Sequence, residues 1–284
     1  LMSVRIVLDS TTDLVPELKN RFTVVPLTVC FGEEEYIDGV TIDSRMFYEK
    51  LIESDVLPTT SQASPYAFEE AFREAVKDGS QVVCITVSSR LSGTYQSAVI
   101  AAEEFPGQVH VVDSQTIALG SAILTEYALS LVDRGMDAET IALNLMRKRE
   151  KVRLLAMLDT LEYLKKGGRI SSAVALAGGL LNIKPVICIE NGEIKMLGKA
   201  RGSRQANNLL VQEIAKAGGV DFDKPVLLGY TGLSDALLKK YIQDSSALWE
   251  GHLENLPCSV VGSVVGTHAG PGAVAVAFFS ADCE

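Results

Sequence analysis

The sequence predicts an α/β protein with two domains. In its first half, short apolar strands alternate with helical segments across short links, which is typical of βαβ units that build a parallel sheet. In its second half, strand pairs are joined by tight turns, which indicates an α/β domain with a mixed or antiparallel sheet. A chain of 284 residues suits two such domains, and we place the boundary so that they span 1–155 and 156–284.

The first half opens with a short apolar strand over residues 4–8. This strand ends in the turn DSTTD at 9–13, a turn of the kind that caps a helix. A second strand is predicted over 23–31, where Pro26 indicates a sheet edge or a bulge because proline has no N–H to donate.

Two helices of the first half begin at recognisable caps. Asp43 can cap a helix over 44–53, and Ser64 can cap the next, with Pro65 at its first helical position. This second helix ends by Gly79. Its apolar residues recur with the spacing of a half-buried helical face: Phe68, Ala71, Phe72, Ala75 and Val76.

The alternation continues to the end of the first half. Strands are predicted over 81–87 and 109–113, each followed by a helix, over 94–105 and 117–134. In parallel sheets, ligands bind beyond the C-terminal ends of the strands, near the N-termini of helices. Three hydroxyl-rich turns fall at or near such positions: 9–13, 59–64 and 88–94.

The second half begins after the charged stretch RKREK at 147–151. A strand over 152–158 follows, and residues 186–196 are predicted to form a hairpin with an Asn-Gly turn. Three further strands are expected, the last two flanking the turn HAGPG at 268–272: 226–230, 260–267 and 273–279.

Charge and hydropathy argue against two classes of partner. The formal net charge is -10, which disfavours nucleic acid and anionic membrane surfaces because both require a basic face. The longest apolar stretch, 173–189, is too short and too interrupted by glycine, lysine and proline to span a bilayer. The first residues predict a strand rather than a secretory signal. We therefore expect no nucleic acid partner and no stable membrane insertion.

The cysteines predict reduced thiols in a cytoplasmic protein. Their number is odd, their spacing is wide, and no C-x-x-C occurs. Because no Cys/His cluster and no pair of histidines has metal-ligand spacing, we predict no metal. The five residues are Cys30, Cys84, Cys188, Cys258 and Cys283.

The turn SSRLSGT at 88–94 is a candidate anion site. A turn between a strand and a helix offers free backbone N–H groups and the positive end of a helix dipole. Gly93 permits close approach of a ligand, and Ser92 or Thr94 adds a hydroxyl. The simpler alternative is that these hydroxyls only cap the helix. The turn matches neither a nucleotide-binding loop, which requires a lysine, nor the G-x-S-x-G of a hydrolase nucleophile.

Two other turns are candidates for the same site. TTSQASP at 59–65 contains more hydroxyls than one cap needs, although a capped turn remains the alternative. His268 lies in HAGPG directly after a predicted strand, where it either presents a side chain to a cleft or has no role. His110 and His252 show no such placement.

Two short basic turns stand out on an acidic chain. KKGGRIS begins at Lys165 and KARGSR begins at Lys199. They are either solvated surface, or a docking patch or a contact for a phosphate group.

Six motifs occur in the order seen in the DegV family and span nearly the whole chain, which therefore resembles that family: DSTTD (9–13), TSQ (60–62), LSGTYQSA (91–98), VDS (112–114), KGGRIS (166–171) and THAGPG (267–272). The resemblance implies a two-domain protein that binds one long-chain fatty acid between its domains and needs no cofactor. It also implies the FakB-type subunit of bacterial fatty acid kinase, from which a separate ATP-using kinase subunit makes acyl phosphate for phospholipid synthesis. One departure is Ala63, which replaces the more usual proline and affects the rigidity of the turn.

The resemblance also assigns roles to individual residues. It implies that the carboxylate hydrogen-bonds to Thr60 and Ser92, and that His268 joins this network. It places three more groups beside the carboxylate: Ser61 and the backbone of Gly93 and Thr94. Two arginines resemble those associated with the kinase encounter or the phosphorylated head group: Arg169 and Arg201.

A lipid-presenting subunit and an enzyme make different predictions. The subunit needs no nucleotide-binding loop, metal ligands or nucleophile–base pair, and the sequence shows none of these. The alternative is an enzyme in its own right, either a small-molecule kinase or a hydrolase that uses a serine of 88–94 with His268. We expect a monomer.

Overall fold

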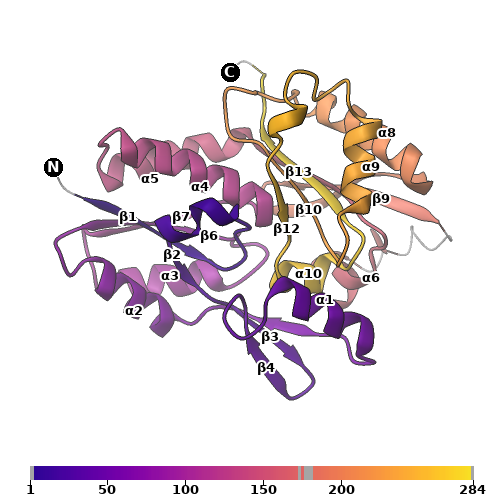
Figure 1. Ribbon diagram of the computed structural model, residues 1–284. Helices are drawn as coiled ribbons and strands as arrows, with labels where there is room; N and C mark the ends of the chain where they lie inside the picture. Colours follow the sequence, from indigo (N-terminus) through magenta and orange to yellow (C-terminus); the bar gives the residue numbers. More distant parts are fainter. Residues whose placement is uncertain (1–2, 172–173, 176–181, 283–284) are drawn as a thin grey trace.

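The first half of the chain forms a four-stranded parallel sheet in the computed structural model, which describes residues 3–171, 174–175 and 182–282 (Figure 1). Helices cover both faces of this sheet, so the predicted βαβ arrangement is confirmed. The strands in spatial order are β2 (Thr23–Val25), β1 (Val4–Asp9), β6 (Gln81–Thr86) and β7 (Val109–Asp113). One face carries α2 (Pro65–Ala75) and α3 (Thr94–Ala102), and the other carries α4 (Ala118–Asp133) and α5 (Ala138–Lys148).

The second half forms a six-stranded sheet in which neighbouring strands are antiparallel except for one parallel pair, β11 with β12. The predicted mixed sheet is therefore confirmed. Its strands in spatial order are β10 (Glu193–Arg201), β9 (Ile183–Glu190), β8 (Val152–Met157), β13 (Val274–Phe279), β11 (Leu227–Tyr230) and β12 (Cys258–Val260). Helices α8 (Gly202–Lys216) and α9 (Ala236–Asp244) pack on one face, while α4 packs on the other. A boundary after residue 155 falls inside β8.

The prediction of one strand over 23–31 is wrong. The segment contains two strands of different sheets, because β2 ends at Val25 and β3 (Thr28–Phe31) pairs with β4 (Glu34–Ile37) and β5 (Thr59–Ser61). Pro26 lies at the break, where a residue without an N–H cannot continue the ladder. The hydroxyl-rich segment that starts at Thr59 is thus a strand of this small antiparallel sheet rather than a turn after a parallel strand.

The prediction of a strand over 260–267 is also wrong. β12 ends at Val260, and Ser263–Ala269 forms helix α10. A valine-rich composition favours a strand, but the start of this helix donates hydrogen bonds to carboxyl groups that lie far away in the sequence. His268 therefore lies in the last turn of a helix, and not in a loop that follows a strand.

The caps and turns that depend on close neighbours are confirmed. Asp43 accepts a hydrogen bond of 2.8 Å from the Met46 N–H at the start of α1 (Ser44–Glu53). Ser64 accepts one of 3.1 Å from Ala67 at the start of α2. The turn between β9 and β10 contains Asn191 and Gly192 at positive φ. The described chain also contains four short helices: η1 (Pro16–Arg21), η2 (Arg149–Lys151), α6 (Glu162–Lys166) and η3 (Leu253–Asn255).

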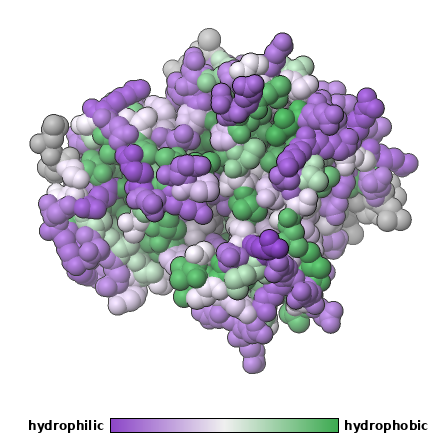
Figure 2. All heavy atoms as spheres, in the orientation of Figure 1, coloured by the Kyte–Doolittle hydropathy of each residue, from purple (hydrophilic) through white to green (hydrophobic). Residues whose placement is uncertain are grey.

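Within the described residues, no helix is long and apolar enough to cross a membrane. The apolar stretch at 173–189 lies partly outside those residues, and its described end belongs to β9. Four cysteines are free thiols, and Cys283 lies outside the described residues: Cys30, Cys84, Cys188 and Cys258. Figure 2 shows hydrophilic residues around most of the visible face, with hydrophobic residues interspersed between them.

Candidate functional site

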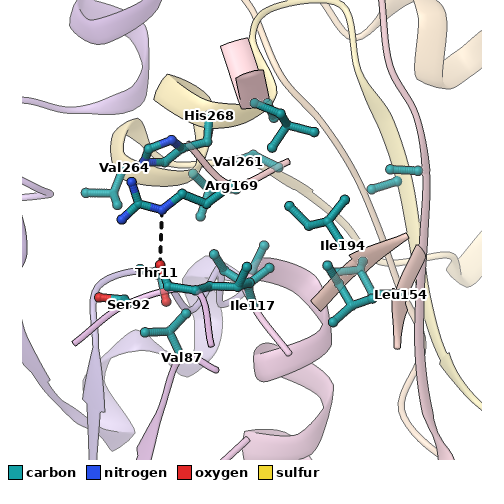
Figure 3. Close-up of a pocket in the computed structure, with 18 of the residues that line it drawn as sticks. Thr11, Val87, Ser92, Ile117, Leu154, Arg169, Ile194, Val261, Val264 and His268 are labelled. Carbon is teal, nitrogen blue, oxygen red and sulfur yellow. Dashed lines mark hydrogen bonds between the residues drawn. The ribbon is translucent and has the colours of Figure 1, made fainter. Parts of the chain in front are cut away.

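A cavity of about 420 Å³ lies where the two halves of the chain meet. Its volume falls in the range of roughly 300–1,000 Å³ that is usual for small-molecule sites. The first half contributes β5, the loops after β1 and β6 and the start of α4, and the second half contributes β8, β9, β13 and α10. In Figure 3, the polar side chains Ser92, Arg169 and His268 lie toward one side of the cavity, and Leu154 and Ile194 lie toward the other.

The polar side of the cavity joins two segments that are 208 residues apart. The hydroxyl of Thr60 lies 2.8 Å from Nε2 of His268. Ser92 lies nearby on the loop after β6, and its Oγ lies 2.9 Å from the Thr94 hydroxyl and accepts a hydrogen bond of 3.2 Å from the Thr94 N–H. The structure thus brings Thr60, Ser92 and His268 to one cavity.

The remaining predicted carboxylate residues are placed in different ways. Ser61 and Gly93 line the cavity beside Thr60 and Ser92. Thr94 is fully buried, and its Oγ1 accepts a hydrogen bond of 3.4 Å from the Ala63 N–H, so it braces the two segments.

Gly93 has a packing role that the sequence does not reveal. A Cβ at this position would lie 2.0 Å from Oε1 of Gln62, so the missing side chain makes room for that glutamine. Gln62 in turn donates a hydrogen bond of 3.2 Å to Ser97 in α3. The segment after β5 is therefore fastened to the helix that follows the Ser92 loop.

The other walls of the cavity are mostly apolar. Strand β13 shows how this wall is made, because Ala275 faces the cavity while Val274 and Val276 pack on the opposite face of the sheet. Small side chains on this strand leave space that larger ones would fill. The apolar lining of the second half also includes Leu154, Ala156, Leu158, Ile187, Ile189, Ile194 and Ala273.

The imidazole of His268 is held in its neutral form. Burial lowers its pKa to about 4, and the nearby positive charge of Arg169 acts in the same direction. Nδ1 has no hydrogen-bond partner among the described residues, and Gly167 lies so close that a Cβ there would be 2.2 Å from this atom. A hydrolase would need a stronger base paired with its serine nucleophile, whereas His268 pairs with Thr60.

The two arginines occupy different surroundings. Arg169 is half-buried in the cavity wall, where its Nε donates to the Leu91 carbonyl at 3.1 Å and its Nη1 donates to the Gly167 carbonyl at 2.6 Å. Arg201 is exposed at the end of β10 and does not line the cavity.

Three buried acids near the cavity received no role in the sequence analysis, although two of them belong to the turn DSTTD. Asp9 accepts hydrogen bonds from the Thr11 and Val87 N–H groups, at 2.9 and 2.6 Å. Asp13 accepts one of 2.9 Å from the Gly262 N–H, and Asp38 accepts one from the Ser263 hydroxyl. The motif DSTTD therefore caps no helix of its own and instead holds distant segments together, which no local signal indicates.

The histidines outside the cavity have other surroundings. The His252 ring stacks on Phe222 with 3.9 Å between ring centroids, which gives it a packing role. His110 lies in β7. Among the described residues, no group of three or more His, Cys, Asp or Glu side chains could hold a metal ion.

The chain matches the family model of the DegV proteins over residues 3–281. A DegV domain-containing protein of Deinococcus radiodurans is 37% identical over 283 residues, which cover 97% of this chain and 98% of the relative. The match therefore extends over both halves.

Two solved structures connect this fold with lipid. A fatty-acid-binding DegV family protein from Thermus thermophilus is similar with a TM-score of 0.88 and 33% identity, over 98% of this chain and 100% of that one. The fatty acid kinase B3 protein of Streptococcus pneumoniae, loaded with linoleic acid, is similar with a TM-score of 0.83 and 25% identity, over 98% and 99% of the two chains.

Proposed function

Because the chain belongs to the DegV family, we propose that it binds one long-chain fatty acid in the cavity between its halves. The observation that carries this proposal is the division of the cavity into a polar side and an apolar remainder. A carboxylate suits the hydroxyls and the neutral imidazole at the polar side, and an acyl chain suits the walls of leucine, isoleucine and alanine.

The acyl chain would supply most of the affinity. Burial contributes about 0.8 kcal/mol per methylene, so a chain of roughly 14 methylenes contributes on the order of 11 kcal/mol before the costs of association. These costs include the lost freedom of the ligand and of the side chains it orders. The apolar lining therefore sets how tightly the ligand is held.

The polar side would orient the ligand. Thr60 and Ser92 would bind the carboxylate, with Ser61 and the backbone of Gly93 beside it, and Thr94 would hold Ser92 in place. Each charge-assisted hydrogen bond contributes roughly 1.5–3 kcal/mol. His268 would fix the Thr60 hydroxyl, since its Nε2 lies within hydrogen-bond distance of that group.

The bound carboxylate would be the substrate of a second protein. In this proposal, a separate ATP-dependent kinase subunit phosphorylates it, and the acyl phosphate enters phospholipid synthesis in the cytoplasm. The likeness to a protein of the Streptococcus pneumoniae fatty acid kinase supports this role. In the same proposal, Arg169 in the cavity wall would contact the phosphorylated head group, and the exposed Arg201 would contact the kinase.

Native mass spectrometry of the purified protein, followed by solvent extraction and lipid identification, tests the binding step. We expect one fatty acid per chain, and the identified acid names the tail. A protein whose mass shows no bound lipid, even after incubation with mixed long-chain acids, would contradict the proposal. Turnover of ATP or of an ester by this chain alone would instead support the alternative of an enzyme.

A further inference from the structure

Helix α10 belongs to the second half of the chain but is fastened to the first half at both ends. At its start, the Gly262 N–H donates to Oδ1 of Asp13 at 2.9 Å, across 249 residues of sequence. The Ser263 hydroxyl donates to Asp38, across 225 residues. In its last turn, His268 lies against the Thr60 hydroxyl. The same short helix thus links two remote acids to the polar side of the cavity.

The two acids replace a cap that the helix lacks. The first N–H groups of a helix need acceptors from outside it, and a polar side chain at the N-cap normally supplies one. Here the N-cap is Gly262, which has no side chain, and no local side chain caps the helix. Asp13 and Asp38 are buried, so water does not replace them.

Contacts with Tyr48 hold the rest of the helix in a fixed position. The Tyr48 hydroxyl donates a buried hydrogen bond of 2.8 Å to the Val261 carbonyl, just before the helix. Gly266 lies so close to the same tyrosine that a Cβ would be 2.6 Å from its hydroxyl. Seven residues of helix extend only about 10 Å, so a shift at the first turn is transmitted to His268.

We propose that Asp13 and Asp38 are positioning residues for His268, which hold α10 so that the imidazole stands at the Thr60 hydroxyl. Neither acid lines the cavity, so they act through the helix and not on the ligand. The consequence for a bound carboxylate rests on the proposed function. The positioning itself is a property of the protein without ligand.

The pKa of His268 in the delipidated protein measures this positioning. The chain has three histidines, so histidine-labelled protein gives three NMR titration curves. In the wild type, burial and the Arg169 charge keep the pKa of His268 at about 4. In Asp13→Ala, the Gly262 N–H loses its acceptor and the helix start loosens. We expect the pKa of His268 to rise toward its ordinary value of about 6.5, with the curves of His110 and His252 unchanged.

The conservative variant separates positioning from general destabilisation. Asp13→Asn keeps an oxygen acceptor for Gly262, so we expect its His268 to titrate as in the wild type. Asp9→Ala is the control matched to Asp13→Ala, because Asp9 is also buried but bonds to Thr11 and Val87 rather than to α10. It should lower stability without moving the His268 curve.

A milder variant covers the case in which Asp13→Ala does not fold. Ser263→Ala removes only the hydroxyl bond to Asp38 and should raise the pKa of His268 by a smaller amount. An unchanged His268 curve in Asp13→Ala and Ser263→Ala, or an equal shift in Asp13→Asn and Asp13→Ala, would overturn the inference. Failure of wild-type protein to bind a fatty acid would count against the proposed function instead, because the titration needs no ligand.

Discussion

Asp13 carries an unusual protonation state at the junction of the two halves. Burial raises the pKa of its carboxyl to about 8, and the neighbouring Asp38 acts in the same direction, while the Gly262 N–H and Lys19 act against it. Its second oxygen has no hydrogen-bond partner among the described residues. A neutral carboxyl tolerates such a place far better than a carboxylate does, because an unpaired buried charge is costly.

This protonation state predicts how stability depends on pH. Between about pH 4 and pH 8, Asp13 has released its proton in the unfolded chain but retains it in the folded protein. The unfolded state then binds fewer protons, so the contribution of Asp13 to stability falls as the pH rises. Asp13→Asn lacks this dependence. As the pH rises from 5 to 8, we expect the unfolding free energy of the variant, relative to that of the wild type, to increase by about 1 kcal/mol or more.

Urea unfolding at several values of pH measures this difference. Asp55→Asn, at an exposed acid, serves as the control and should run parallel to the wild type. The other buried acids, Asp9 and Asp38, are present in all three proteins, and their effect on the pKa of Asp13 is part of the difference that the comparison measures. Parallel profiles for Asp13→Asn and the wild type would show that Asp13 is ionised in the folded state.

Ser92 offers a test of the division between head and tail. If the tail supplies the affinity and the hydroxyl orients the carboxylate, Ser92→Ala should retain bound lipid but slow phosphorylation by the kinase subunit. Loss of one charge-assisted hydrogen bond should lower the rate of phosphorylation by roughly tenfold or more. Extracted lipid and acyl phosphate formation are the two measurements. Ser89→Ala, at an exposed serine of the same loop that does not line the cavity, is the control, and equal loss of lipid and rate in Ser92→Ala would argue against the division.

At the scale of elements, the sequence predicts correctly what neighbours in sequence determine. The caps at Asp43 and Ser64 lie within three residues of the N–H groups they bind, and both are as predicted. The break at Pro26 and helix α10 depend instead on pairing with remote segments. Pro26 indicates an edge or a bulge but not a change of sheet, and no local pattern indicates α10, because tertiary contacts override local propensity at both places.

The same distinction applies to the candidate site. Hydroxyls near strand and helix ends and a histidine beside glycines indicated the candidate turns, and the resemblance to the DegV family selected Thr60, Ser92 and His268, which line one cavity. The apolar walls were not predictable residue by residue, since the apolar neighbours Ala275 and Val276 point to opposite faces of the sheet and only Ala275 lines the cavity. The role of Asp13 depends on a partner 249 residues away.

The hairpin of β9 and β10 fastens its tip to the loop that carries Ser92. The Ser88 hydroxyl donates a buried hydrogen bond of 2.7 Å to the Gly192 carbonyl, and Arg90 forms an exposed ion pair with Glu193. Both strands of the hairpin line the cavity, through Ile187 and Ile194 among others. The bond between Ser88 and Gly192 would therefore help to keep the hairpin closed over a bound acyl chain.

Loosening the hairpin tip should speed exchange of the ligand. Ser88→Ala removes a bond that is worth about 0.5–1.5 kcal/mol, so we expect a fluorescent fatty acid to dissociate roughly two- to tenfold faster. Stopped-flow fluorescence gives this rate. Lys195→Ala is a matched control, because its ion pair with Glu190 stays within the hairpin. Equal dissociation rates in Ser88→Ala and the wild type would show that exchange does not pass through this contact.

At the scale of the whole molecule, the two halves share one hydrophobic core. Helix α4 packs against both sheets, so Leu8 and Ile85 of the parallel sheet belong to the same buried cluster as Leu154 and Phe279 of the six-stranded sheet. Helix α4 belongs to the first half and reaches the second. Helix α10 belongs to the second half and forms hydrogen bonds with the first. Neither half can lose its structure without exposing apolar surface of the other, which favours joint unfolding.

We therefore expect the two halves to unfold in one transition, although the sequence predicts two domains. Trp249 is the single tryptophan and is fully buried in the second half, so its fluorescence follows that half. Cys84 is fully buried in β6, so labelling of its thiol, read from the labelled peptide by mass spectrometry, follows the first. In urea, both signals should give the same midpoint, and a bound fatty acid should raise both equally because the cavity is lined from both halves. Two separate midpoints would show that the shared core around α4 does not couple the halves, and a ligand that raised only one of them would place its binding energy in that half alone.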